Sequence, residues 1–121
     1  MTSIAPWMSV ADTAAAIAFY EAAFGARVVE RLGDDDVTFV ALLTIGGAEV
    51  WLQLEPETAP DGRDGPVRMI LTVDDPDATF ARALAAGATE YAGIHEEHGW
   101  RIGHIVDPCG HHWEIGRRLA V

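Results

Sequence analysis

The sequence contains no lysine, and its eight basic residues, all arginines, stand against 19 acidic residues, so the formal net charge is −11. A chain this acidic offers no basic surface that could neutralise phosphates, and we therefore expect no nucleic-acid partner. The absence of lysine also excludes catalysis through a Schiff base formed on the chain itself.

Cysteines and long apolar runs are scarce as well. Because Cys109 is the only cysteine, no disulfide can form within the chain, and this is typical of the reducing cytoplasm. No apolar run approaches the roughly 20 residues needed to span a membrane. Residues 1–7 also lack the basic and apolar regions of a signal peptide. We expect a cytoplasmic protein with no membrane partner.

The chain does contain a regular succession of strand and helix patterns, and its apolar half is enough for one core. The first part predicts a helix after the N-cap Asp12 and four strands, the helix over residues 13–24 and the strands over 4–10, 26–32, 37–45 and 48–54. The second part predicts a helix after the N-cap Asp75 and four strands, the helix over residues 77–86 and the strands over 67–73, 88–94, 100–106 and 111–116. Residues 95–99 are expected to form an exposed loop.

The two parts match each other at a nearly constant spacing, with one slip of a single residue at the helix ends, where Gly25 matches Gly87. Val10-Ala11-Asp12 matches Val73-Asp74-Asp75, and Gly47 matches Gly110, both at an offset of 63 residues. The chain therefore predicts a duplicated βαβββ unit, with repeat 1 at 4–54, a Pro- and Gly-rich linker at 55–65 and repeat 2 at 66–117. We expect a single α+β domain over residues 1–121, with eight strands curled into an open barrel or cup and the helices outside.

Two motifs relate the chain to a known family: Phe-Tyr-Glu-Ala-Ala-Phe-Gly-Ala at residues 19–26 and Asp-Pro-x-Gly-His-x-Trp-Glu at residues 107–114. With the duplication, these motifs resemble the vicinal-oxygen-chelate superfamily. That group includes glyoxalase I, fosfomycin-resistance enzymes, extradiol dioxygenases and the metal-free bleomycin-resistance proteins. The resemblance implies an active site inside the cup and, for a chain of this length, a homodimer.

The resemblance also implies where a metal would bind. Metal-dependent members place one ligand on the first and one on the last strand of each unit. Carried over to this sequence, those positions hold Ala5, Trp51, Arg68 and Glu114. Only Glu114 can coordinate a divalent ion, and an arginine would repel one. We therefore expect no metal and no other cofactor, with a divalent metal as the alternative.

Alternation along the strands predicts which side chains face the cup. The candidate ligand-binding residues are Trp7, Glu49, Trp51, Arg68, His104, His112 and Glu114. We expect Arg68 and Glu114 to form a charge-assisted hydrogen bond. The two tryptophans either stack on a planar ligand or fill the barrel as core.

Three functions are compatible with this pattern. The first is metal-independent binding or sequestration of a small aromatic or cationic compound, as in antibiotic resistance. The second is a metal-dependent lyase, isomerase or dioxygenase, in which His104 and Glu114 are catalytic or form a relocated metal site with His112. The third is a domain that dimerises and has no small-molecule role.

Overall fold

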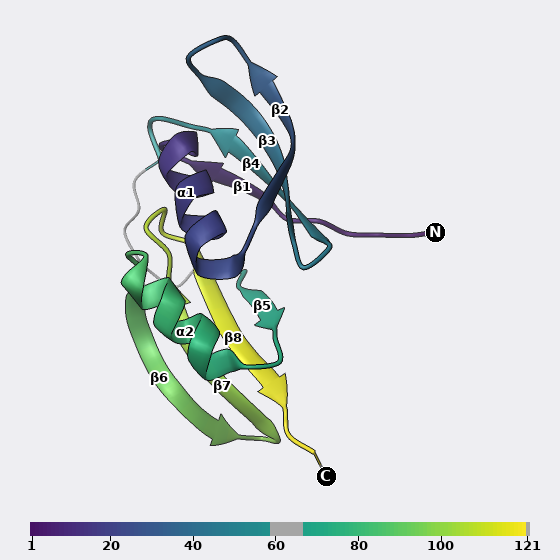
Figure 1. Cartoon of the computed structure of the whole chain (residues 1–121), viewed down its shortest axis with the longest axis vertical. Helices are drawn as coiled ribbons and strands as arrows, with labels where there is room; N and C mark the ends of the chain where they lie inside the picture. Colours follow the sequence, from purple (N-terminus) through teal and green to yellow (C-terminus); the bar gives the residue numbers. More distant parts are fainter. Residues whose placement is uncertain (59–66, 121) are drawn as a thin grey trace. The chain divides into compact units, whose positions relative to one another are not determined.

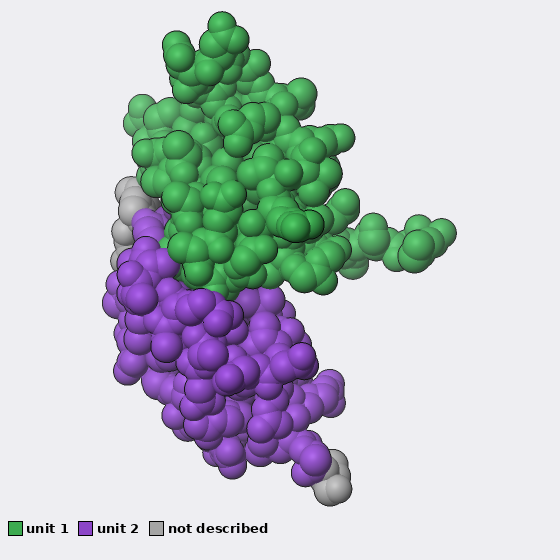
Figure 2. Space-filling model, in the orientation of Figure 1, with its two compact units in different colours: residues 1–59 green, residues 60–121 purple. Residues whose placement is uncertain are grey.

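The computed structural model describes residues 1–58 and 67–120, and the chain forms two compact units, Met1–Ala59 and Pro60–Val121 (Figure 2). Each unit contains one four-stranded sheet and one helix (Figure 1). This confirms the predicted α+β fold of two tandem βαβββ units. Residues 59–65 of the expected linker lie outside the described residues. In the described part of the chain, no helix is long and apolar enough to cross a membrane.

In the first unit, strand β1 is parallel to β4, and the other neighbouring strands are antiparallel, in the order β1-β4-β3-β2. Helix α1 packs against β3 and β4. The elements are β1 (Trp7–Val10), α1 (Thr13–Phe24), β2 (Arg27–Gly33), β3 (Thr38–Ile45) and β4 (Ala48–Leu54).

Both ends of α1 lie where the sequence predicts them. The Asp12 carboxylate accepts a hydrogen bond from the Ala15 N–H at 3.0 Å and so caps the first turn. Gly25 ends the helix with a φ of 69°, a left-handed conformation that costs glycine little. The buried face of the helix carries aromatic rings, including Tyr20 and Phe24, which stack at 6.0 Å.

The second unit repeats this arrangement, with β5 parallel to β8 in the order β5-β8-β7-β6. Helix α2 packs against β6, β7 and β8. The elements are β5 (Met69–Thr72), α2 (Pro76–Ala85), β6 (Thr89–Glu97), β7 (Trp100–Val106) and β8 (His112–Arg118).

The strand register reproduces the internal repeat. Trp7 pairs with Trp51 in the first unit, and Ile70 pairs with Glu114 in the second. Both partners of the second pair are 63 residues after their equivalents, as the sequence offset requires. Position for position, Glu114 therefore stands where the first unit has Trp51.

The predicted loop over residues 95–99 is wrong. Strand β6 continues to Glu97, and only His98 and Gly99 form the turn into β7. Both turn residues have a positive φ, 50° and 81°, as the primed turns of two-residue hairpins require. Since this end of an edge strand is polar on both faces, it lacks the apolar alternation that identifies a strand.

Smaller differences concern strand ends. The strand predicted at 4–10 begins only at Trp7, and the one predicted at 67–73 begins at Met69, because the parallel ladders with β4 and β8 begin there. Ala5 and Arg68, the other two positions taken from the family pattern, therefore lie just before the first strand of each unit.

Candidate functional site

In the first unit, two tryptophans form an aromatic surface on the face of the sheet away from α1; Trp7 is exposed and Trp51 is half-buried. The rings of Trp7 and Trp51 stack with centroids 5.9 Å apart and an interplanar angle of 27°. The Trp7 indole N–H donates a hydrogen bond to Gln53 Oε1 at 2.7 Å, and Trp7 is 55% exposed. By alternation, Glu49 lies on the same face of β4, two residues before Trp51. The tryptophans therefore do not fill a core.

In the second unit, Arg68 and Glu114 approach each other as predicted, but less closely. Arg68 Nη1 is 3.9 Å from Glu114 Oε1, so the contact is an ion pair, and the expected hydrogen bond is wrong. Half of the Arg68 side chain is exposed to solvent, and the Glu114 side chain is about a quarter exposed. An ion pair with this exposure contributes little to the stability of the fold. Because both side chains are partly exposed, both charges are accessible to a third group.

His104 and His112 lie on neighbouring strands and are buried. His104 Nε2 is 2.8 Å from His112 Nδ1, so one imidazole donates a hydrogen bond to the other. The ring of Tyr91 stacks on His104 at 4.2 Å and meets His112 edge-on at 5.5 Å. The three side chains form a packed polar cluster, and Tyr91 is the member that the sequence did not indicate.

A cavity of about 250 Å³ opens on the face of the second sheet that bears Glu114. Its walls combine apolar surface with two carboxylates, and its lining residues are Ile70, Glu97, His98, Trp100, Ile102 and Glu114. Because residues 95–99 were expected to form a loop, the sequence did not predict the contributions of Glu97 and His98.

Oxygen atoms with negative charge or partial charge surround His95, next to the cavity. His95 Nδ1 lies 2.8 Å from the Gly93 carbonyl oxygen, and its Nε2 lies 3.3 Å from Glu97 Oε1. The Gly93 carbonyl, the Glu97 carboxylate and the charge of Glu114 raise the pKa of His95 above its ordinary value. The field near this cavity therefore favours a cation.

A larger cavity, of about 560 Å³, lies beside the start of α1 in the first unit. It contains none of the predicted site residues, and three of its polar side chains serve local structure. Asp12 caps α1, the Thr13 hydroxyl donates to the Thr38 carbonyl oxygen, and Asp34 accepts from the Val37 N–H. We assign it no function.

Asp107 fixes the turn that leads into β8. Its Oδ1 accepts hydrogen bonds from the N–H groups of Cys109 and His111, at 2.9 and 3.0 Å. Its Oδ2 accepts from the indole N–H of buried Trp113 at 2.9 Å. One buried carboxylate thereby joins the Asp-Pro turn to the core and determines where His112 and Glu114 begin their strand.

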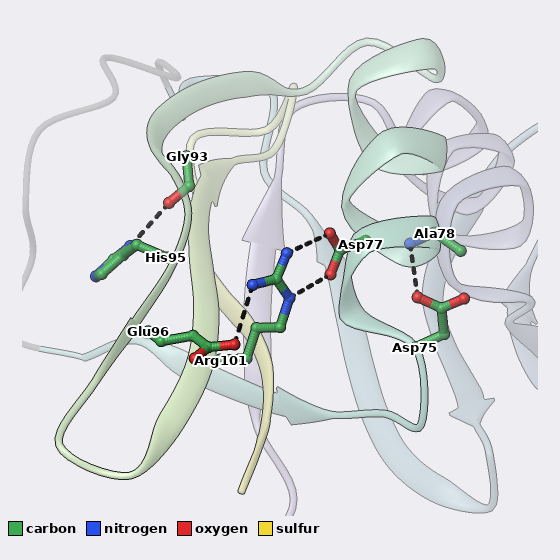
Figure 3. A network of polar contacts seen from close by, with 7 residues as sticks. All are labelled: Asp75, Asp77, Ala78, Gly93, His95, Glu96 and Arg101. Atoms are coloured by element: carbon green, nitrogen blue, oxygen red, sulfur yellow. Dashed lines mark hydrogen bonds and ion pairs between the residues drawn. The ribbon is translucent and has the colours of Figure 1, made fainter. Parts of the chain in front are cut away.

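A second polar network joins α2 to the β6–β7 hairpin (Figure 3). The Arg101 guanidinium donates two hydrogen bonds to the Asp77 carboxylate, at 2.7 and 2.6 Å, and one to Glu96 at 3.2 Å. The hydrogen bonds from Arg101 lower the pKa of Asp77. The bidentate geometry holds the hairpin, and with it one wall of the cavity, against the helix.

This network predicts a stability change in acid. The folded-state pKa of Asp77 lies below its ordinary 3.8, so the contact stabilises the fold above about pH 4 and loses this effect as the pH falls through the folded-state pKa. In Arg101→Gln, we expect this acid-dependent part of the unfolding free energy to disappear, whereas Arg82→Gln, an equal charge change on α2, should retain it. Denaturant melts between pH 2 and 6 measure the difference. An Asp77 carboxyl that titrates at 3.8 or above by NMR would contradict the prediction.

The residues at the family's metal-ligand positions do not fit a divalent ion. Ala5 has no donor atom, Trp51 is stacked on Trp7, and a guanidinium already lies 3.9 Å from Glu114. The facing nitrogens of His104 and His112 are hydrogen-bonded to each other. Within residues 1–58 and 67–120, no three His, Cys, Asp or Glu side chains are grouped to hold a metal.

Three pairs of the predicted site residues thus come together: Trp7 with Trp51, Arg68 with Glu114, and His104 with His112. This set, carried on a duplicated βαβββ fold, defines a domain of the glyoxalase type. Residues 7–116 match the glyoxalase-like domain family. The chain belongs to this family. It shares its fold with a glyoxalase/bleomycin resistance protein/dioxygenase family enzyme from Burkholderia phytofirmans PsJN, with a TM-score of 0.76 and 20% identity over 95% of this chain and 97% of that chain.

The chain is also similar over nearly its whole length to individual proteins and solved structures. An uncharacterized protein of Mycobacterium bovis is 38% identical to this chain, over 95% of the chain and 82% of the relative. The crystal structure of TioX from Micromonospora sp. ML1 has a TM-score of 0.79 and 27% identity, and covers 98% of this chain and 100% of TioX.

A more distant structural neighbour is the fosfomycin resistance protein FosX from Listeria monocytogenes, solved as a variant with Mn(II) and dihydroxypropylphosphonic acid. It has a TM-score of 0.74 and 15% identity, over 94% of this chain and 88% of FosX. At this identity, the likeness concerns the fold alone.

Proposed function

We propose that this protein binds a small aromatic or cationic compound on its strand faces without a metal ion. The observation that carries the proposal is the stacked Trp7–Trp51 pair, in which Trp7 is exposed and Trp51 is half-buried. In metal-dependent members of the superfamily, the corresponding strand face carries a side chain that coordinates the metal ion. In this chain the tryptophan pair occupies that face and supplies no such donor atom.

The geometry of the pair suits a planar ligand. A tryptophan that is 55% exposed leaves much apolar surface in water, and covering this surface is favourable. The hydrogen bond to Gln53 fixes the plane of the Trp7 ring, which reduces the entropy lost on binding. Glu49, on the same face of β4, adds a negative charge that favours a cationic ring system.

The test is a calorimetric titration with a planar cationic dye, 9-aminoacridine. Because one ring stack contributes about 0.5–1.5 kcal/mol, we expect Trp7→Ala and Trp51→Ala each to weaken binding by about twofold to tenfold. Phe39→Ala is the matched control, since Phe39 is also exposed but lies by alternation on the opposite face of this sheet. Equal affinity in all three variants would refute the proposed surface.

Metal analysis of the purified protein separates this proposal from a metal-dependent enzyme. We expect no stoichiometric Ni, Zn, Mn or Fe, since only Glu114 among the four family positions is a ligand type. One bound ion per chain that is lost in Glu114→Gln would favour the lyase, isomerase or dioxygenase alternative.

A further inference from the structure

The cavity of about 250 Å³ in the second unit combines two kinds of wall. Ile70, Ile102 and Trp100 supply apolar and aromatic surface. Among residues 1–58 and 67–120, the carboxylates of Glu97 and Glu114 are the acidic groups of its lining, and no arginine lines it. The volume is just below the roughly 300–1,000 Å³ of pockets for drug-sized ligands, so the cavity suits a smaller molecule.

Three of the lining residues, Glu97, Glu114 and Trp100, already contact a basic side chain of the chain itself. Arg68 approaches Glu114 at 3.9 Å, and the Arg118 guanidinium carbon lies 5.0 Å from the centre of the Trp100 ring. The third contact is that of His95 with Glu97, at 3.3 Å. The two arginine contacts, and that of His95 when it is protonated, indicate that the groups lining this cavity bind positive charge.

From this geometry we propose that the cavity binds a small organic ammonium ion, with the ammonium group at Glu114 and Glu97 and its apolar or aryl part against Trp100 and the two isoleucines. The inference deepens the proposed function and rests on it for the premise that the strand faces bind ligands. It does not involve Trp7 or Trp51, so the two proposals can fail separately.

The loose Arg68–Glu114 contact gives the proposal a directional consequence. At 3.9 Å the guanidinium makes no hydrogen bond to the carboxylate, and half of the Arg68 side chain is in solvent. An ammonium group in the cavity can donate shorter hydrogen bonds to the same carboxylate. Arg68 is therefore a competitor of the ligand, and removing its charge should strengthen binding.

The probe is benzylammonium, with benzyl alcohol as its uncharged counterpart. In ¹⁵N-labelled protein, the four tryptophans give four indole N–H signals, and single Trp→Phe variants assign them. We expect benzylammonium to shift the Trp100 signal in a saturable manner and to leave the Trp7 signal in place. Benzyl alcohol should bind at least tenfold more weakly.

Charge variants then test the named residues. Glu114→Gln should weaken benzylammonium binding by about tenfold, because it removes a charge-assisted hydrogen bond. Arg68→Gln should strengthen binding by about threefold, the gain expected when a loosely paired competing charge is removed. Glu90→Gln is the matched control: Glu90 is exposed on β6, outside the cavity, and the change in net charge is the same as in Glu114→Gln.

Weaker binding in Arg68→Gln would overturn the proposal, as would equal binding of benzyl alcohol or the lack of a saturable Trp100 shift. If Glu114→Gln does not fold, Arg68→Gln and the benzyl alcohol comparison still decide. A response at Trp7 and not at Trp100 would refute the cavity and leave the proposed function intact. If benzylammonium shifts the Trp100 signal but Trp7→Ala leaves 9-aminoacridine binding unchanged, the tryptophan surface is refuted and the cavity proposal stands.

Discussion

Replacing Asp107 with alanine is expected to lower the free energy of unfolding by about 3 kcal/mol. The substitution removes the acceptor of three hydrogen bonds, from the backbone N–H groups of Cys109 and His111 and from the Trp113 indole. The Trp113 side chain is 3% exposed, so its N–H would lose this acceptor in a buried site. Guanidinium melts followed by tryptophan fluorescence measure the change.

Two further variants show whether the hydrogen bonds cause this loss. Asp107→Asn keeps one oxygen for the turn but places an NH₂ group against the Trp113 N–H, so we expect an intermediate loss of stability. Asp74→Ala removes an exposed carboxylate from the same unit and should change the unfolding free energy by less than about 0.5 kcal/mol. A loss in Asp107→Ala as small as that in Asp74→Ala would show that the turn is held by other groups.

The second large effect is expected for Gly116→Ala, at about 2–3 kcal/mol of lost stability. A Cβ atom at this position would lie 2.7 Å from the Arg101 carbonyl oxygen and 2.9 Å from Ile102 Cγ1. The carbonyl belongs to the neighbouring strand, which cannot move away without disturbing its ladder with β8. The same change displaces Ile102, a lining residue of the cavity, so benzylammonium binding should weaken too.

Other glycines of the second unit provide graded controls. At Gly103, an added Cβ would lie 2.7 Å from the edge of the Phe80 ring, which can shift more easily than a main chain. Gly103→Ala should therefore cost less than Gly116→Ala, and Phe80→Leu should partly restore it. At Gly93 the nearest atom is 3.5 Å away, so Gly93→Ala should be close to neutral. If all three alanine variants had equal stability, the close approach of neighbouring atoms would not be the reason why these positions hold glycine.

The fold could be predicted because its information is local and repeated. Caps such as Asp12 and Asp75 fix the helix starts through hydrogen bonds to residues three positions away. The offset of 63 then transfers the strand pairing of one unit to the other, including the position of Glu114. The hairpin at His98 escaped prediction because a polar edge strand gives no apolar alternation.

For the site, the sequence predicted which residues lie on the same strand face, but not the contacts between their side chains. The family's metal-ligand positions implied that Arg68 and Glu114 lie near each other, but the distance of 3.9 Å depends on side-chain rotamers that strand position does not determine. The stacking of Tyr91 on His104 is a contact across β6 and β7 in a stretch where the register shifts. Such irregular pairing leaves no periodic signal in the sequence.

The duplicated register has a consequence for how this protein can change. Main-chain hydrogen bonds hold β1 to β4 and β5 to β8, so the side chains at Trp51 and Glu114 are free to differ while the pairing is the same. The first unit has a pair of stacked tryptophans at this position, and the second has the ion pair of Glu114 with Arg68. Substitutions can therefore alter the surface chemistry of one copy without rebuilding the scaffold of the other, and the repeat makes the protein modular.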